Sequence, residues 1–156
     1  MKTLLRSLAA AAAFLALVTF LAPTASAALV AQRITIQFKT LEDGKGPGSA
    51  VSVFVHAGGE VVARNEDFAR GALAGNSTSG EFTIPIVRGP VTAEELREFR
   101  VSVHLQAPPG KTDAWKFDFV IRIHMSNGGV ITREAKNVGL KSVSGGAAVV
   151  SHDFRL

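Results

Sequence analysis

Three neighbouring residues near the C-terminus, Ser151, His152 and Asp153, are of the types that form a catalytic triad. Adjacent residues of a strand point to opposite faces of a sheet, so a nucleophile, a base and an orienting acid in direct succession cannot line up. No other serine, threonine or pair of acids stands in a motif with catalytic spacing. The sequence therefore predicts a protein that is not an enzyme.

The four histidines are scattered along the chain. His104 and His124 both lie on the polar side of an alternating segment, and imidazole is a common metal ligand. If the two segments pair in the right register, the two rings meet and form a metal site. We favour the alternative, in which both rings lie on a solvated face.

Two loops rich in glycine and proline carry acidic side chains. Residues 41–49 contain Glu42 and Asp43, and residues 107–114 contain Asp113. Calcium takes several oxygen ligands from flexible loops, and the carbonyls of glycine-rich loops can supplement carboxylates. These three acids therefore form a candidate calcium site. Ordinary turn chemistry, in which aspartate bonds its own backbone, is the alternative explanation.

The single tryptophan, Trp115, follows the second of these loops. Its place in the alternation puts it in the core, whereas its position at the start of a strand also allows a ring that is partly exposed at one end of the fold. There it would contact lipid, sugar or a protein partner. We add Lys111, in the same loop, and Phe68, the expected core anchor of the irregular segment 65–79, as candidate ligand-binding residues.

The element that must position these residues is the segment 115–125. Trp115, Phe117, Phe119, Ile121, Ile123 and Met125 share one parity, and the other parity is polar apart from Val120. A period of two predicts a strand with one buried face. Six large apolar side chains on one face need a facing layer, which other segments must supply.

Further alternating segments predict strands over residues 33–40, 50–56, 60–64, 81–87, 99–106, 130–133, 139–143 and 147–156. Pro85 lacks an amide hydrogen, so its strand is expected at an edge or bulged. Thr92 and Glu95 form a capping-box pattern that predicts a helix of about two turns over residues 92–98. The pattern predicts an all-β fold, a two-layer antiparallel β-sandwich of about eight strands with one short helix. A small closed barrel is the alternative.

Residues 1–27 have the pattern of a secretory signal peptide. Lys2 and Arg6 precede an apolar run over residues 8–22, and Ala25-Ser26-Ala27 supplies the small residues of a cleavage site. The run is shorter than the ~20 residues that span a bilayer. We therefore expect an exported protein, in a bacterial periplasm or outside the cell, with one domain over residues 28–156 and no transmembrane span after cleavage.

Composition narrows the partners of this domain. The sequence has no cysteine, so its stability comes without disulfides. Removing Lys2 and Arg6 from the 17 basic side chains leaves 15, against 13 acidic ones. A net charge of +2 without a long basic run does not supply the basic surface that nucleic-acid binding requires, so we expect no nucleic-acid partner.

The order of these segments resembles a known family. The stretches ITIQFKT, EDGKGPGSA and VSVFVHAGG, then DFARG, EFTIPIV and FRVSVHLQ, and finally WKFDFVIRI, are similar to the PLAT domain (polycystin, lipoxygenase, alpha-toxin) over about residues 33–125. The resemblance implies an eight-stranded β-sandwich that binds membrane lipid or a protein partner, in some members with calcium in the end loops. It would make Asp43 and Asp113 the loop acids and Trp115 the structural or contact aromatic.

Together these patterns predict a secreted, non-catalytic binding module. It would contact a lipid surface or a protein partner through its end loops, with calcium as a candidate aid. The alternative is a periplasmic or cell-surface structural or interaction protein that uses a sheet edge and takes no small ligand.

Overall fold

The computed structural model describes residues 27–156. The predicted signal peptide lies outside these residues, apart from Ala27 at its end. Within the described part, no helix has the length and apolar character needed to cross a membrane.

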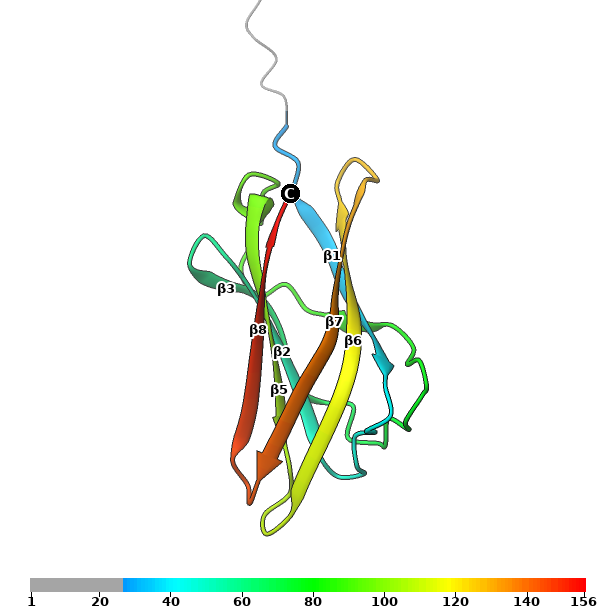
Figure 1. The fold of residues 1–156 in the computed structure, drawn as a ribbon. Helices are drawn as coiled ribbons and strands as arrows, with labels where there is room; N and C mark the ends of the chain where they lie inside the picture. Colours follow the sequence, from blue (N-terminus) through cyan, green and yellow to red (C-terminus); the bar gives the residue numbers. More distant parts are fainter. Residues whose placement is uncertain (1–26) are drawn as a thin grey trace, which may run out of the picture.

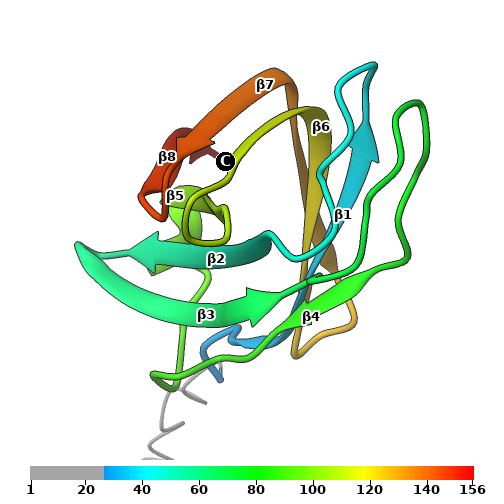
Figure 2. The same ribbon diagram turned by 90° about the horizontal axis from the view of Figure 1, so that it is seen from below.

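Eight strands form two antiparallel sheets of four strands each, stacked face to face (Figures 1 and 2). The first sheet has the order β4-β1-β6-β7 and the second has the order β3-β2-β5-β8. Because neither sheet closes on itself, the predicted β-sandwich is confirmed and the closed-barrel alternative is wrong. The strands are β1 (Ala31–Thr40), β2 (Ala50–Ala57), β3 (Glu60–Phe68), β4 (Phe82–Ile84), β5 (Glu98–Gln106), β6 (Thr112–Met125), β7 (Val130–Val143) and β8 (Ala147–Arg155).

The core lies between the sheets and is built on β6, as its alternation predicts. Five of the six apolar side chains of its inner face are 0% exposed, and Met125 is 5% exposed. They face buried valines of β2 and β5, such as Val53 and Val103. Burial of each large apolar side chain contributes roughly 1.5–3 kcal/mol, so this face supplies much of the stability of the fold.

Strand β7 differs from the prediction. Residues 130–133 and 139–143 belong to one strand of 14 residues, Val130–Val143, rather than to two short ones. A bulge lies where the register with β6 shifts, and Asn137 adopts φ +53 there while its N–H donates to the Asp118 carboxylate. The extra residue interrupts the period of two, which is why the alternation seemed to end.

Two predictions between β3 and β5 need correction. The strand expected over residues 81–87 is only Phe82–Ile84, because Pro85 cannot donate to a ladder. The helix expected over residues 92–98 is a single 3₁₀ turn, η1 (Glu95–Arg97). The reciprocal capping-box bonds do form, with Thr92 N–H donating to the Glu95 carboxylate at 2.9 Å and Glu95 N–H donating to Thr92 Oγ1 at 3.3 Å. The turn ends at once because Glu98 already pairs with β8.

Candidate functional site

The predicted site residues gather at one end of the sandwich. Here β1 leads into residues 41–49, β5 leads into β6, and β7 turns back into β8. The last two connections form the lowest point of the molecule in Figure 1. We call residues 107–111 and 141–146 the tip.

The loop 41–49 is folded around a buried lysine. Lys45 is 2% exposed, and its Nζ donates hydrogen bonds to the carbonyls of Ser49 at 2.6 Å and Gly46 at 3.0 Å. Its backbone also pairs with Leu73 of the β3–β4 connection. Burial lowers the pKa of Lys45, and the nearby Asp113 carboxylate partly offsets that effect. Sequence reasoning missed this residue because lysine is seldom buried.

Asp113 holds the same loop from the other side. Its two carboxylate oxygens accept the Gly46 N–H at 3.0 and 3.2 Å, and its side chain is half-buried. With the Lys45 charge beside it, this carboxylate is compensated inside the protein. Asp113 therefore positions the loop backbone, and its oxygens face protein groups.

Glu42 and Asp43 are paired with a lysine. The Lys116 Nζ lies 3.3 Å from a Glu42 oxygen and 3.4 Å from an Asp43 oxygen, and these two hydrogen bonds, led by Glu42, raise the pKa of Lys116. The Lys116 ammonium group thus occupies the position between the Glu42 and Asp43 carboxylates where a bound calcium ion would lie. The three candidate calcium ligands are split between two separate contacts, and residues 27–156 contain no group of three or more histidines, cysteines or acids that could hold a metal ion.

The two candidate aromatic residues pack inside the protein. Trp115 is 0% exposed, its Nε1–H donates to Thr40 Oγ1 at 3.2 Å, and its ring stacks on Phe117 with centroids 3.9 Å apart. Trp115 therefore occupies the predicted core position, and the alternative of a partly exposed ring at the end of the fold is wrong. Phe68 is half-buried with its ring 5.0 Å from that of Phe82, and it anchors the chain where β3 ends.

Lys111 lies on the surface of the tip. Its carbonyl accepts the Ser144 N–H at 2.9 Å, which ties the two connections of the tip together. Strand pairing brings two residues that the sequence analysis missed to this corner, Lys141 opposite Ala114 and Val143 opposite Thr112. Val143 is 57% exposed. Only the pairing register of β6 with β7 would have placed Lys141 and Val143 here, and the bulge in β7 hid that register from the sequence analysis.

The histidines do not form a metal site. His104 lies on β5 of one sheet and His124 on β6 of the other, so the hypothesis that their strands pair is wrong. His104 packs on Phe54, with ring centroids 4.7 Å apart, and His124 contacts Arg33. In the segment 151–153, the His152 ring packs between the sheets against Phe119.

No family model matches the sequence, and a search of curated proteins found no match either. The similarity to the PLAT domain is therefore a resemblance of the sequence pattern alone.

Proposed function

We propose that the protein is a non-catalytic binding module that docks its tip on an anionic lipid surface. The observation that carries this proposal is the composition of the tip. Lys111 and Lys141 are exposed, and neither forms an ion pair within residues 27–156. Pro109 and Val143, each two residues from one of these lysines in the chain, are exposed as well. Two exposed apolar side chains together with two unpaired cations suit a layer of acidic headgroups.

The charge of the tip is uncompensated. Residues 107–111 and 141–146 contain no acid. The carboxylates at this end of the sandwich have other partners. Asp113 accepts the Gly46 N–H, and both Glu42 and Asp43 face Lys116. Asp67, which lines a pocket together with Pro108 and Pro109, pairs with Arg70. Each lysine near an anionic membrane contributes about 1 kcal/mol, and salt screens that attraction. The expected binding is weak and sensitive to salt.

The tip is held in shape before it binds. Ala107 N–H donates to Ser142 Oγ at 2.9 Å, and Ser142 Oγ–H donates to the Gly146 carbonyl. The Ser144–Lys111 bond adds a third link. A preformed surface loses little conformational entropy on binding, so ordering of the tip does not offset the attraction of its two lysines.

The test is vesicle flotation of the protein with phosphatidylcholine alone and with a mixture of phosphatidylcholine and phosphatidylglycerol, each with calcium and with a chelator. We expect flotation only with the anionic vesicles, unchanged by the chelator and lost in high salt. The double variant Lys111→Ala/Lys141→Ala should bind roughly thirtyfold more weakly, because two such lysines together contribute about 2 kcal/mol. The matched control, Lys39→Ala/Lys136→Ala, removes two exposed lysines outside the tip.

Three outcomes would contradict the proposal. Equal flotation with neutral vesicles would indicate apolar contact without charge recognition. Flotation that requires calcium would restore a calcium site that includes Glu42, Asp43 and Asp113. Absence of flotation under every condition would favour a protein partner.

A protein partner has a specific surface of its own at the outer edge of β8. Leu156 N–H donates to the Arg97 carbonyl. In this register the backbone N–H and C=O groups of the even-numbered residues of β8 point toward β5, and those of the odd-numbered residues point away from β5, along the free edge. Within residues 27–156 no strand pairs beyond β8. The N–H groups of Val149, Ser151 and Asp153 would then bond an added strand, and their hydrogen exchange would slow when the partner binds.

A further inference from the structure

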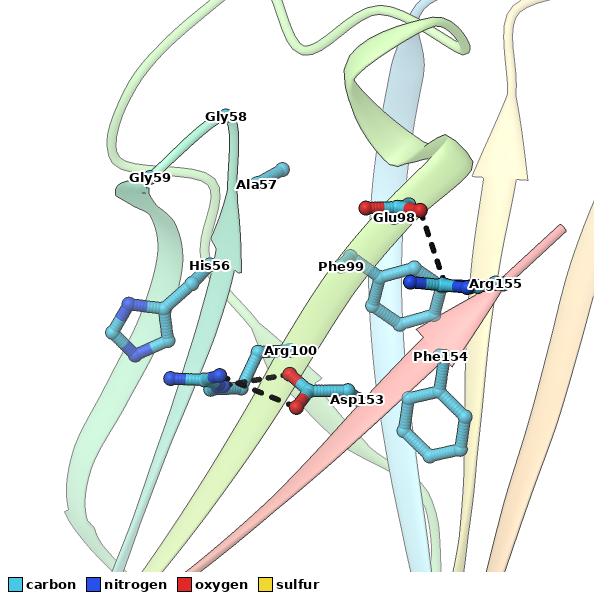
Figure 3. Close-up of a pocket in the computed structure, with 10 residues that line it drawn as sticks. All are labelled: His56, Ala57, Gly58, Gly59, Glu98, Phe99, Arg100, Asp153, Phe154 and Arg155. Carbon is cyan, nitrogen blue, oxygen red and sulfur yellow. Dashed lines mark hydrogen bonds and ion pairs between the residues drawn. The ribbon is translucent and has the colours of Figure 1, made fainter.

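A groove of about 420 Å³ lies on the outer face of the second sheet, at the end opposite the tip (Figure 3). His56 of β2, Arg100 of β5 and Asp153 of β8 stand side by side across it, since they are paired in register. The turn Gly58-Gly59 forms one wall, and the Glu98–Arg155 ion pair lies beyond. We propose that this groove binds an uncharged carbohydrate.

The floor of the groove offers donors and acceptors in fixed pairs. Arg100 donates to both oxygens of Asp153, at 2.7 and 3.2 Å, which orients both planar groups. A second guanidinium–carboxylate pair, Arg155–Glu98 at 3.1 Å, lies two residues along each strand, about 7 Å away. In this pair β5 supplies the acid and β8 supplies the arginine. Adjacent hydroxyl groups of a sugar both donate and accept, so they can bond a guanidinium and a carboxylate that lie side by side.

The charges of the groove balance. Two guanidinium groups face two carboxylates, and burial together with the Arg100 charge lowers the pKa of His56, which favours the neutral form of its ring. A site without net charge gives no electrostatic preference to an anion or a cation. An uncharged ligand that satisfies polar groups through hydrogen bonds fits this lining better.

The main chain under the groove is already used. β5 pairs with β2 on one side and with β8 on the other, so its N–H and C=O groups are engaged in the ladders. A ligand on this face meets side chains rather than the strand edge that a peptide would need. At the wall, a Cβ added to Gly59 would meet no atom within 4 Å, so the turn leaves space open for the ligand.

The same face continues into an aromatic patch next to the groove. Phe54, two residues before His56, packs on His104, and both rings are half-buried. Beside them Ser102 Oγ and Ser151 Oγ lie 2.8 Å apart in a hydrogen bond. Ser102 is buried and Ser151 is exposed, so the Ser151 hydroxyl is the one that a ligand can reach. An apolar ring face bordered by a hydroxyl matches a sugar, which has apolar C–H faces and a polar rim.

The ion pairs can be shared with a ligand at little cost. The Arg100 and Asp153 side chains are 54% and 71% exposed, and exposed pairs contribute little to stability. Their groups can therefore accept new bonds without disturbing the sheet. This property also makes Arg100 a suitable position for a test that leaves the fold intact.

The experiment is a titration of the ¹⁵N-labelled protein with maltohexaose, cellohexaose and N-acetylchitohexaose, followed by amide chemical shifts. We expect saturable shifts with at least one of them, at Gly58, Gly59, Arg100 and Asp153. Arg100→Ala should weaken that binding at least tenfold, whereas the control Arg122→Ala, which breaks the Arg122–Glu81 pair of the other sheet, should leave it unchanged. Phe54→Ala should weaken binding by a smaller factor.

No saturable shift with any of the three sugars would overturn the proposal, and so would equal binding by the Arg100→Ala variant. Binding of an oligogalacturonate alone would show that the groove takes an anion instead. The tip variant Lys111→Ala/Lys141→Ala should keep its affinity for the sugar. Failure of the lipid proposal and failure of this one are therefore distinguishable.

Discussion

The two lateral sides of the sandwich are closed in different ways. On the side of β3 and β4 the main chain joins the sheets, because Arg64 N–H donates to the Pro85 carbonyl and Val87 N–H donates to the Val62 carbonyl, both at 3.0 Å. On the side of β7 and β8 the sheets are joined at the tip by the connecting turn. At the other end, the Arg133 guanidinium donates to the Thr132 carbonyl of one edge and the Arg155 carbonyl of the other.

Between these two points the β7–β8 side is filled by side chains alone. Phe154 and His152 of β8 are half-buried and pack edge-on against Phe119, with ring centroids 6.2 and 5.7 Å away. The His152 Nε2 is buried there without a hydrogen-bond partner. Where main-chain hydrogen bonds join the sheets, few particular side chains are needed. Where side chains fill the gap, the closure depends on the identity of those residues, and the edge of β8 stays accessible.

A pair of proline substitutions would test this difference most strongly. Arg64→Pro removes the N–H that bonds the Pro85 carbonyl and constrains the strand as well. We expect the free energy of unfolding to fall by about 3 kcal/mol, the upper end for a polar group left without its partner. Val149→Pro removes an outward N–H of β8, where proline is tolerated, so it should cost much less. Urea denaturation measures both, with Arg64→Ala as the control that keeps the N–H. Equal losses for the two prolines would refute the distinction between the sides.

The next largest effect concerns the packing on the β7–β8 side. Phe154→Ala removes a ring that lies 5.2 Å from Phe99 as well as the contact with Phe119, and we expect a loss of about 2–3 kcal/mol for this half-buried site. Leu156→Ala, at a side chain that is 52% exposed, should change the stability by less than about 0.5 kcal/mol. A Phe154 loss as small as that of Leu156 would show that the side chains do not close this side.

A smaller effect is expected where Arg133 bridges the two edges. Arg133→Lys keeps the charge but cannot present a planar fork to two carbonyls, so the loss should be about 1 kcal/mol or less. Hydrogen exchange is the sharper measurement, and the amides of Phe154 and Leu156 should exchange faster than in the wild type. Arg97→Lys, at an exposed side chain paired with Glu94, serves as the control. Unchanged exchange at both amides would show that Arg133 does not hold the two edges together.

The contrast between the sides also shows what the sequence could predict. The alternation of β6 predicted its buried face correctly, because a half-buried strand imposes a period of two on its side chains. The same argument failed for β7, where Ala135 and Val138 both face the core across the bulge at Asn137. The parity changes at that point, and no local pattern announces an inserted residue.

The candidate site shows the same limit. The acids Glu42, Asp43 and Asp113 were found from their loops, but their partners were not. Lys116 lies 74 residues from Glu42 in the sequence, and Asp113 lies 67 residues from Gly46. Local spacing carries no information about such contacts, which are set by the pairing of β1 with β6. The Thr92–Glu95 pattern was predictable because both of its bonds are local.

The smallest effect is expected from the ionic groups beside the main-chain closure. Arg88 N–H also bonds the Val62 carbonyl, at 3.3 Å, and its guanidinium pairs with Glu95 and with Glu60. The Thr92 N–H bond, followed by the hydrogen bond from Arg88, lowers the pKa of Glu95 from 4.5 to about 2. A lowered pKa stabilises the fold fully above 4.5, and that contribution is lost as the pH falls toward 2.

The melting temperature of Glu95→Gln should therefore lie below that of the wild type at pH 7, and the gap should close between pH 4.5 and pH 2. Glu94→Gln, which loses only an exposed pair with Arg97, should show a smaller gap at pH 7. A gap that persists at pH 2 would mean that the variant disturbs the turn itself rather than its charge. Because the Arg64–Pro85 and Val87–Val62 bonds do not titrate, the β3–β4 side should stay closed in this variant at every pH.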